Sequence, residues 1–387
     1  MTAAPTRTGD RRAIVLAAGG TGGHMFPAEA LARVLVARGE RVVLITDRRG
    51  QSFGRDLSEV EIQRIHSATL QPGLAGKLRT AAALLRGYGE ARGLLRSFAP
   101  AVVVGFGSYA SAPTVYAAGR LRIPVVLHEQ NAHVGRANRL VAGKARAIAT
   151  SFPQVAGLKP AEQAKCVFVG NPVRPAIAAL AGGRYRPPGA GERVRLLVTG
   201  GSQGARVFSE RVPQAVALLP DGLRGRLDIV QQCRREDLDG ARRAYREIGL
   251  APELSDFFDD MPQRLAACHL AVMRAGASTV AELAVAGRPS ILLPYPHATD
   301  DHQTANARAL AAAGGTVLMP QAEATAEALS QAIRELAADP ARLAAMAEAA
   351  RGFGRIDAAD RLADLVQRLA GRNGNGHHGR TETEEAA

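Results

Sequence analysis

The same local pattern occurs twice in this chain, about 180 residues apart. Residues 14–24 read IVLAAGGTGGH and residues 196–205 read LLVTGGSQGA, each a short apolar run followed by a glycine-rich turn and a segment of helical periodicity. A helix that starts at such a turn presents free backbone N–H groups at the positive end of its dipole, which favours phosphate. The repeat therefore predicts two α/β domains that face each other over a cleft, each offering a turn to an anionic ligand.

Apolar runs of strand length alternate with segments of helical periodicity along most of the chain. This alternation predicts parallel sheets built from βαβ units. The expected strands are residues 13–18, 41–46, 101–105, 124–128, 147–151 and 167–169, then 194–199, 227–230, 270–273, 290–293 and 316–319. The polar, Gly/Pro-rich stretch at residues 181–192 is typical of a linker between the two sets.

The length of 387 residues also favours two domains, because one hydrophobic core rarely grows so large. We expect an α/β protein with two Rossmann-like domains, the first at residues 11–175 and the second at residues 192–352. Residues 353–370 are expected to form a C-terminal helix that packs back on the first domain. Residues 371–387 have no apolar face to bury and are expected to be a disordered tail.

The composition argues against three classes: membrane-spanning proteins, secreted proteins, and proteins stabilised by disulfides or a zinc ion. No stretch reaches the roughly 18 uninterrupted apolar residues of a membrane span, and the N-terminal residues lack the apolar segment of a signal peptide. The three cysteines, Cys166, Cys233 and Cys268, are widely spaced and form no CxxC pair, so neither a disulfide framework nor a zinc site is expected. A reducing cytoplasm fits this composition best.

The net charge of +13 is unevenly distributed. Residues 1–172 carry 23 Lys and Arg against 10 Asp and Glu, whereas residues 173–387 carry 26 of each. An arginine-rich composition is one explanation, although it would affect both halves alike. The other is that the first domain approaches something anionic: nucleic acid, an acidic membrane surface or a phosphorylated acceptor.

The first glycine turn, residues 19–24, matches neither common nucleotide fingerprint. Met25 stands where the third glycine of G-x-G-x-x-G would fall, and the Gly-Lys-Ser/Thr of a P-loop is absent from the sequence. His24 is either a helix-start residue bonded to backbone or a base placed to take a proton from a sugar hydroxyl. Asp47 resembles the ribose-binding acid of a nicotinamide domain, but that interpretation needs the missing fingerprint.

Polar and glycine residues follow two further strands of the first half. Residues 128–131 read HEQN and residues 105–109 read GFGSY, each at the carboxyl end of an expected strand. Open α/β sheets bind ligands at that edge. Four consecutive hydrogen-bonding side chains are costly to bury without partners, so HEQN is either a structural network or part of a ligand site.

The second half adds three candidate segments. Residues 257–261, FFDDM, offer an apolar ledge for a base. Glu282 lies about one and a half turns into the helix that follows residues 274–277, where it is either a solvated helix acid or an acceptor for both ribose hydroxyls. The run Asp300, Asp301 and His302 raises the question of a metal, but no Asp-x-Asp accompanies a diphosphate turn, so metal dependence is not expected.

Taken together, these motifs resemble those of glycosyltransferases with two Rossmann-like domains. They are most similar to the bacterial family that adds GlcNAc to lipid-linked MurNAc-pentapeptide, converting lipid I into lipid II. In chain order the motifs are GGTGGH at 19–24, GFGSY at 105–109, HEQN at 128–131, GNPVR at 170–174, GGSQGA at 200–205, FFDDM at 257–261, RAGASTVAE at 274–282 and H-x5-Q-x2-N at 297–306. Two departures occur: Ser108 replaces a glycine, and Ala275 replaces a serine near the diphosphate turn.

The resemblance implies the GT-B fold and a direct, inverting transfer of GlcNAc from UDP-GlcNAc to the C4 hydroxyl of the acceptor sugar. Such a displacement needs a base for the hydroxyl and positive potential for the departing UDP. His24 is the expected base, with Glu129 as its nearest rival. UDP-GlcNAc is a substrate, and neither a bound cofactor nor a metal is expected.

The resemblance also divides the ligands between the domains. The neutral second domain is expected to hold the donor, with uracil against Phe258, ribose on Glu282 and sugar hydroxyls near Gln303 and Asn306. The expected donor-binding residues are Thr21, Gly22, Gly23, Asn131, Arg174, Ser202, Phe258, Ala277, Ser278, Thr279, Val280, Ala281, Glu282, Gln303 and Asn306. The residues expected at the acceptor's diphosphate, in the basic first domain, are Gly19, Gly20, Gly105, Gly107 and Ser108.

Residues 70–96 carry leucines and cations at helical spacing, including Leu78, Leu85, Lys77 and Arg79. They form either an amphipathic helix packed on its own sheet or a segment that lies on an anionic membrane. The resemblance implies a peripheral protein at the cytoplasmic face of the bacterial cell membrane. It also makes other cell-wall synthesis or division proteins candidate partners.

Three other classes account for only part of the sequence. A sugar-nucleotide epimerase of similar build would explain the fold but not the basic first half. A nicotinamide dehydrogenase would need the missing glycine fingerprint. A nucleic-acid-binding module would explain the charge, but the cations are not interleaved with aromatic residues, which make up only 4% of the chain, so no nucleic acid is expected as a partner.

Overall fold

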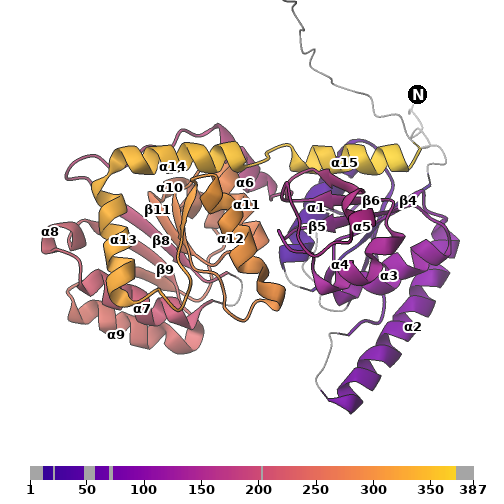
Figure 1. Ribbon diagram of the computed structural model, residues 1–387, viewed down its shortest axis with the longest axis horizontal. Helices are drawn as coiled ribbons and strands as arrows, with labels where there is room; N and C mark the ends of the chain where they lie inside the picture. Colours follow the sequence, from indigo (N-terminus) through magenta and orange to yellow (C-terminus); the bar gives the residue numbers. More distant parts are fainter. Residues whose placement is uncertain (1–11, 21, 48–56, 69–72, 202–203, 372–387) are drawn as a thin grey trace, which may run out of the picture.

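The computed structural model describes residues 12–20, 22–47, 57–68, 73–201 and 204–371. Within these residues the chain forms two α/β domains arranged along the long axis of the molecule, each with its own parallel sheet (Figure 1). The expected fold class is therefore confirmed. The expected tail falls almost entirely outside the described residues.

The first domain contains a seven-stranded parallel sheet with the order β3-β2-β1-β4-β5-β6-β7. Its strands are β1 (Ile14–Ala17), β2 (Val42–Thr46), β3 (Glu61–Arg64), β4 (Val102–Gly105), β5 (Val125–Glu129), β6 (Ala147–Thr150) and β7 (Cys166–Phe168). Its helices are α1 (Gly22–Ala37), α2 (Leu74–Phe98), α3 (Ser108–Arg120), α4 (Arg136–Val141), the short 3-10 helix η1 (Ala142–Lys144) and α5 (Pro160–Gln163).

A connecting segment with α6 (Pro175–Ala178) and η2 (Ala179–Gly182) leads to the second domain. Its six-stranded parallel sheet has the order β10-β9-β8-β11-β12-β13. The strands are β8 (Val194–Thr199), β9 (Leu227–Gln232), β10 (Glu253–Ser255), β11 (Leu270–Met273), β12 (Ser290–Leu292) and β13 (Thr316–Leu318). The helices are α7 (Arg206–Ala217), α8 (Asp221–Arg224), η3 (Arg235–Asp237), α9 (Leu238–Glu247), α10 (Met261–Ala267), α11 (Ala277–Ala286), η4 (Thr299–Asp301), α12 (His302–Ala312), α13 (Ala326–Ala338) and α14 (Pro340–Phe353).

Two strands, β3 and β10, were not expected from the sequence, and both lie at the edge of their sheet. Residues 61–64 read EIQR and are half-buried to exposed, whereas every residue of β1 and β4 is buried. An edge strand pairs on one side only and needs no continuous apolar run. The position of an edge strand is therefore set by pairing with its neighbour, and the pattern of apolar residues does not indicate it.

The last helix, α15 (Ala358–Leu369), leaves the second domain and packs on the first (Figure 1). Its buried residues Leu362 and Val366 share one apolar cluster with Ile14 of β1. On the solvent side, Arg38, which directly follows α1, bonds both Asp360 and Asp364 of α15. The C-terminal helix is thus part of the first domain's core and ties the two domains together.

Both sheets have the strand order of a doubly wound fold, so β1 lies between β2 and β4, and β8 lies between β9 and β11. At such a switch point the loops after the two adjacent strands diverge and open a crevice at the carboxyl edge of the sheet. The four glycine turns, which start at Gly19, Gly107, Gly200 and Gly276, follow these strands. The topology therefore brings all four turns to the cleft between the domains.

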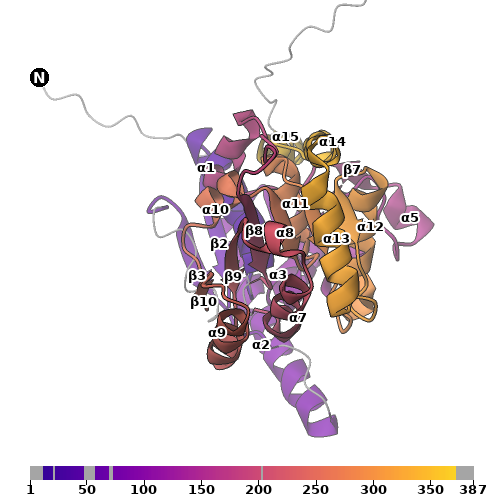
Figure 2. The same cartoon turned by 90° about the vertical axis from the view of Figure 1, so that its left-hand side faces the viewer.

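Helix α2 projects away from the body of the first domain, as both ribbon views show (Figures 1 and 2). Leu78 and Leu85 on this helix are 63% and 71% exposed. Tyr88 of α2 contacts Tyr116 of α3 edge to face, with ring centroids 5.7 Å apart. Among the described residues, no helix combines the length and the hydropathy that crossing a bilayer requires.

Candidate active site

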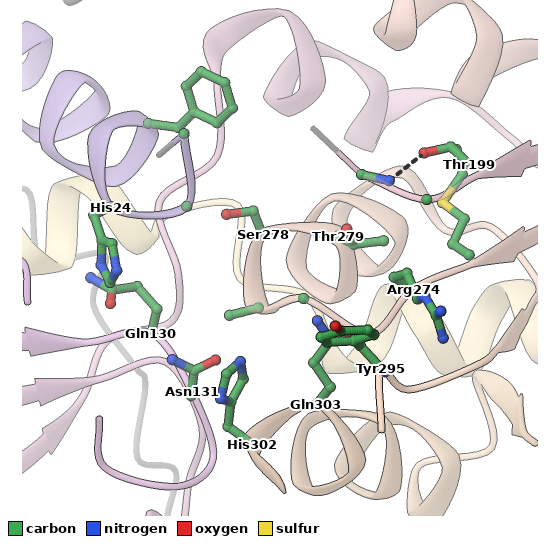
Figure 3. Close-up of a pocket in the computed structure, with 18 of the residues that line it drawn as sticks. His24, Gln130, Asn131, Thr199, Arg274, Ser278, Thr279, Tyr295, His302 and Gln303 are labelled. Carbon is green, nitrogen blue, oxygen red and sulfur yellow. Dashed lines mark hydrogen bonds between the residues drawn. The ribbon is translucent and has the colours of Figure 1, made fainter. Parts of the chain in front are cut away.

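A cleft of about 1670 Å³ lies between the domains and is lined from both sides. His24, Gln130 and Asn131 line it from the first domain, and Arg274 and Gln303 line it from the second (Figure 3). The carboxyl edges of both sheets face this space, so it is the site that the fold offers to a ligand.

On the first domain's side, two glycines adopt backbone conformations that other residues rarely take. Gly20 has a φ of +88° and Gly107 a φ of +80°, and both line the cleft together with Ser108. Gly22 and Gly23 form the first turn of α1 at the same wall. The starts of α1 and α3 therefore turn their free N–H groups toward the cleft, as anion binding requires. Thr21 lies outside the described residues.

Gly19 and Gly105 have a different role from the one expected. Both are buried, and a Cβ on Gly19 would lie 2.5 Å from the Cβ of Ala110. A Cβ on Gly105 would lie 2.5 Å from Cγ2 of Val115. These two glycines let the strand ends pack closely on α3, so the expectation that they contact the acceptor's diphosphate is not supported.

His24 is held in one tautomer by the neighbouring strand end. Its Nδ1 lies 2.8 Å from the carbonyl oxygen of Phe106. Because a carbonyl oxygen only accepts, Nδ1 carries the proton and Nε2 keeps its lone pair while the ring is neutral. Burial lowers the pKa of His24 from its ordinary value, although the Phe106 carbonyl and the Glu129 carboxylate oppose this shift. At neutral pH the imidazole is therefore suited to accept a proton.

Glu129 is 1% exposed, and both of its oxygens are already engaged. Oε1 accepts hydrogen bonds from the backbone N–H of Asn131 at 3.0 Å and from its side chain at 3.3 Å. Oε2 accepts from the N–H of Gly135 at 3.0 Å and from Asn138 at 2.8 Å. The carboxylate thus orders the loop at residues 131–138, and this geometry favours His24 over Glu129 as the base.

The other members of the HEQN segment form a buried chain behind His24. The amide nitrogen of Gln130 donates to the carbonyl oxygen of Phe106 at 2.9 Å and to Nδ1 of His128 at 3.0 Å. Nε2 of His128 then lies 3.3 Å from the carbonyl oxygen of Gly170. Burial lowers the pKa of His128 to about 4, so this ring stays neutral and structural.

On the second domain's side, α11 starts at Ala277 directly after β11 and points its N-terminus at the cleft. Ala277, Ser278 and Thr279 line the cleft wall (Figure 3). The N–H groups of a first helical turn have no partner within the helix, so this terminus suits a diphosphate. The hydroxyl of Ser278 is buried without a hydrogen-bond partner among the described residues.

Val280 and Ala281 do not fit the expected direct contact with the donor. Val280 is 1% exposed, and its N–H already donates to the carbonyl oxygen of Gly276. Ala281 packs against the second domain's apolar core. The expectation for these two residues came from reading the whole motif as ligand-facing, whereas within α11 the cleft is lined by its first turn and by Glu282 and Leu283 one turn further on. Ser202 lies outside the described residues.

Arg274 places a buried positive charge beside the same helix terminus. Its guanidinium donates to the carbonyl oxygens of Leu293 and Pro294, both at 3.1 Å, and to Oε1 of Gln321 at 2.6 Å. These partners carry no net charge, so the cation is hydrogen-bonded but not neutralised by them. Burial lowers the pKa of Arg274 to about 10, which leaves it charged at neutral pH. Arg274 is not among the expected site residues, although it begins the RAGASTVAE motif at 274–282.

The serine-to-alanine departure at Ala275 leaves the turn well held. The N–H of Ala275 donates to Oε1 of Gln303 at 3.2 Å, and its carbonyl oxygen accepts from Asn306 at 3.1 Å. Gln303 Oε1 also accepts from the N–H of Tyr295 at 2.9 Å. Gln303 lies in the cleft as expected and braces the turn that carries Arg274.

Asn306 does not face the cleft. It is 0% exposed, its Oδ1 accepts from the N–H of Ala132 at 2.8 Å, and its amide nitrogen donates to Asn131 at 3.1 Å as well as to Ala275. Its expected contact with the donor sugar is therefore not supported, because every polar atom of its side chain already bonds protein. Asn306 instead joins the second domain to the first.

The aromatic surface expected for uracil differs from the prediction in which of its two rings is exposed. Phe258 is only 7% exposed, and the guanidinium carbon of Arg264 lies 4.0 Å from its ring centroid. The adjacent Phe257 is 59% exposed and lines the cleft. Both rings belong to the cleft wall, but Phe257 presents more aromatic surface to a base.

Ion pairs also cross the cleft. Arg174, at the end of the first domain, donates to Oε1 of Glu282 in α11 through Nε at 3.1 Å and Nη2 at 2.9 Å. Arg136 and Arg139 of α4 bond the two oxygens of Asp300 at 3.3 and 2.8 Å. Asp300 belongs to the run that was considered for a metal, and in the structure it is an interdomain ion-pair partner. The described residues hold no group of three or more His, Cys, Asp or Glu that suits a metal ion.

His302 is a cleft residue that sequence reasoning considered only as a metal ligand. Its Nδ1 lies 2.6 Å from the carbonyl oxygen of Thr299, which fixes the same tautomer as in His24. It begins α12 of the second domain, and its ring lies beside Asn131 of the first domain (Figure 3). The sequence signal for His302 was its place directly before Gln303 in the H-x5-Q-x2-N motif at 297–306.

Comparisons with known proteins agree with this architecture. Residues 14–150 match the family model described as the glycosyltransferase family 28 N-terminal domain, and residues 195–364 match the family 28 C-terminal domain. The crystal structure of MurG from Acinetobacter baumannii is similar with a TM-score of 0.74 and 29% sequence identity, over 92% of this chain and 99% of that chain.

Two curated relatives are more similar in sequence. A protein of Rhodospirillum centenum is 61% identical over 363 residues, covering 94% of this chain and 96% of the relative. One of Rhodospirillum rubrum is 53% identical and covers 92% of each. Both are named UDP-N-acetylglucosamine–N-acetylmuramyl-(pentapeptide) pyrophosphoryl-undecaprenol N-acetylglucosamine transferase.

Two Rossmann-like domains with glycine turns on a shared cleft, each matched by a glycosyltransferase domain model, define a glycosyltransferase of the two-domain, GT-B class. More particularly, both of its domains match one family, and a relative covering nearly the whole chain is 61% identical. The chain belongs to glycosyltransferase family 28.

Proposed function

We propose that this chain transfers GlcNAc from UDP-GlcNAc to the C4 hydroxyl of lipid-linked MurNAc-pentapeptide, with inversion at the anomeric carbon. The observation that carries the proposal is the pairing across one cleft of a proton-accepting His24 with the open α11 terminus and the cation Arg274. The names of the relatives that cover nearly the whole chain support the choice of donor and acceptor.

In this mechanism the acceptor hydroxyl attacks the anomeric carbon while the bond from that carbon to the UDP oxygen breaks. The hydroxyl proton passes to Nε2 of His24, and the resulting imidazolium is favoured by the nearby Glu129 carboxylate. The charge that develops on UDP is met by the N–H groups of α11 and by Arg274. Glu129 acts through its loop and His128 through Gln130, so both are positioning residues in this scheme.

The donor half of the proposal rests on the second domain. Uracil would lie against Phe257 and the edge of Phe258, and the ribose hydroxyls would bond Glu282. Gln303 would contact the sugar from the turn that it braces. Asn131 faces these residues from the first domain, where Glu129 and Asn306 hold it.

We also propose that the protein works at the cytoplasmic face of the cell membrane through α2. The exposed Leu78 and Leu85 lie on the same projecting helix as the exposed cations Lys77 and Arg79. Apolar side chains that enter the interface, next to cations that reach phosphate headgroups, are the usual chemistry of a peripheral membrane helix. The acceptor's lipid would then enter the cleft from the first domain.

The direct test is turnover. Purified protein, UDP-GlcNAc and a short-chain, water-soluble lipid I analogue should give UDP and a β-linked GlcNAc-MurNAc product in equal amounts, seen by mass spectrometry. Release of UDP that does not depend on the acceptor, or conversion of UDP-GlcNAc to another sugar nucleotide, would argue for a hydrolase or an epimerase instead.

A further inference from the structure

The carboxylate proposed for the donor ribose already has a partner from the other domain. Both hydrogen bonds from Arg174 end on the same oxygen of Glu282, Oε1, at 3.1 and 2.9 Å. Arg174 directly precedes α6 at the end of the first domain, whereas Glu282 lies in α11 of the second. The ion pair therefore spans the cleft at the place where a nucleoside would enter.

The surroundings of this pair make an unpartnered carboxylate costly. The side chain of Glu282 is 13% exposed and that of Arg174 is 31% exposed. Burial raises the pKa of Glu282, and Arg174 acts against this shift. A carboxylate with this little water needs hydrogen-bond donors to stay ionised. Arg174 supplies them here, and a ribose diol is the donor group that would replace it in a complex.

The guanidinium has a second anchor that keeps it at the cleft wall. Its central carbon lies 4.8 Å from the ring centroid of Phe26, one turn into α1. This cation–π contact leaves the guanidinium edge free to change its hydrogen-bond partner. Glu282 is five residues beyond Ala277, so the two positions differ by about 7.5 Å along the helix axis. A rotation of the long Arg174 side chain spans a distance of this order.

We propose that Arg174 and the donor ribose compete for Glu282, so that nucleotide binding moves the Arg174 guanidinium from the carboxylate to the donor diphosphate. The inference rests on the proposed function, because it takes Glu282 as the ribose site. In the empty enzyme the arginine satisfies the carboxylate. In the complex the ribose takes this place, and the freed cation neutralises the departing UDP.

This exchange predicts effects of opposite sign for two ligands. Uridine carries the ribose but no phosphate, so it must displace Arg174 and gains nothing from the released cation. UDP displaces the same arginine but binds it again through the diphosphate. Removing the guanidinium should therefore strengthen uridine binding and weaken UDP binding. A guanidinium that only supports Glu282, or only binds phosphate, cannot produce both effects.

The experiment measures the dissociation constants of uridine and UDP by calorimetry at pH 8 and low salt, for the wild type and for Arg174→Gln. Uridine should bind about three- to tenfold more tightly to the variant, and UDP about tenfold or more weakly, the range of charge-assisted hydrogen bonds. The matched control is Arg136→Gln, which removes another cation lining the cleft that bonds Asp300. It should leave uridine binding unchanged and weaken UDP only slightly.

Weaker or unchanged uridine binding by Arg174→Gln would overturn the exchange. Arg174→Lys provides a second comparison, because it keeps the charge but loses the planar fork. It should retain most of the UDP affinity, and a loss as large as that of the glutamine variant would also count against the proposal. If wild-type protein binds neither UDP nor UDP-GlcNAc, the proposed function fails instead, so the two failures are distinguishable.

Discussion

Gln130 and His24 donate hydrogen bonds to the same acceptor, the carbonyl oxygen of Phe106, at 2.9 and 2.8 Å. The shared carbonyl fixes the ring orientation and keeps the proton on Nδ1 of His24. Gln130 in turn bonds His128, whose ring reaches the carbonyl oxygen of Gly170. The proton-accepting side of His24 is therefore set by a buried chain that runs across the edge of the sheet.

His24→Ala should lower kcat by roughly two to four orders of magnitude, the usual contribution of a general base. UDP binding should change less than twofold, because the contacts proposed for UDP do not include His24. Since burial lowers the pKa of His24, the acid limb of the wild-type kcat profile should lie at a lower pH than an ordinary histidine would give. A variant with near-normal kcat would show that His24 is structural and return attention to Glu129.

His128 should make the fold less stable in acid. Its pKa of about 4 lies below the ordinary 6.5, so the unfolded chain binds the extra proton first as the pH falls. The free energy of unfolding should therefore decrease between about pH 6.5 and pH 4, by up to about 3 kcal/mol from this residue. His24 adds a loss in the same direction.

Urea denaturation of the wild type at pH 7 and pH 4.5 measures this loss, and His128→Gln should show a smaller difference between the two pH values. His297→Gln is the matched control, because His297 is exposed and should leave the difference unchanged. An equal pH dependence in all three proteins would assign the acid sensitivity to other groups.

Asn306→Ala should loosen the joint between the domains. The change leaves the N–H of Ala132 without its acceptor, which typically costs about 1–3 kcal/mol of stability when the group stays buried. We expect a lower Tm and a reduced kcat with nearly unchanged UDP binding, because the joint aligns the two ligands. Thr304→Ala, which removes only a local bond to Asp301, should change neither kcat nor UDP affinity. A matching loss of kcat in this control would show that the effect is not specific to the joint.

Glu282→Ala should weaken donor binding chiefly through the ribose. A charge-assisted hydrogen bond typically contributes about 1.5–3 kcal/mol, so the donor KM should rise by one order of magnitude or more. The comparison uses UDP-GlcNAc analogues that lack a ribose hydroxyl, which should lose much less than the natural donor on mutation. Equal losses for both donors would indicate that Glu282 only supports α11.

Replacing Lys77 and Arg79 by Gln should reduce binding to anionic vesicles without changing turnover of a water-soluble acceptor. Each cation near such a surface contributes about 1 kcal/mol, and salt screens this contribution. Co-sedimentation with phosphatidylglycerol vesicles over a range of salt concentrations measures the effect. Arg242→Gln with Arg243→Gln, two exposed cations on α9 of the second domain, gives a control with the same change in charge. Equal loss in both double variants would mean that net charge, rather than α2, governs binding.

The sequence by itself determined the two sheets, their central strands and the glycine turns between strand and helix. Each of these features is local: a buried parallel strand needs a continuous apolar run, and a turn over phosphate needs glycine within a few residues of the strand end. Repetition of the unit along the chain then implied two domains and a cleft. His24 was a candidate proton acceptor from the sequence because it belongs to such a turn, and its role stays a prediction.

Only the tertiary structure decided which polar groups remain free for a ligand. Glu129 and Asn306 occur in ligand-like motifs, yet their side chains are saturated by contacts with loop 131–138 and with the opposite domain. Arg174 and Glu282 are 108 residues apart in sequence and meet only because two domains pack together. The edge strands β3 and β10 were likewise set by pairing with a neighbour. Such contacts depend on how distant segments are brought together, and neither local propensity nor hydrophobic period specifies that arrangement.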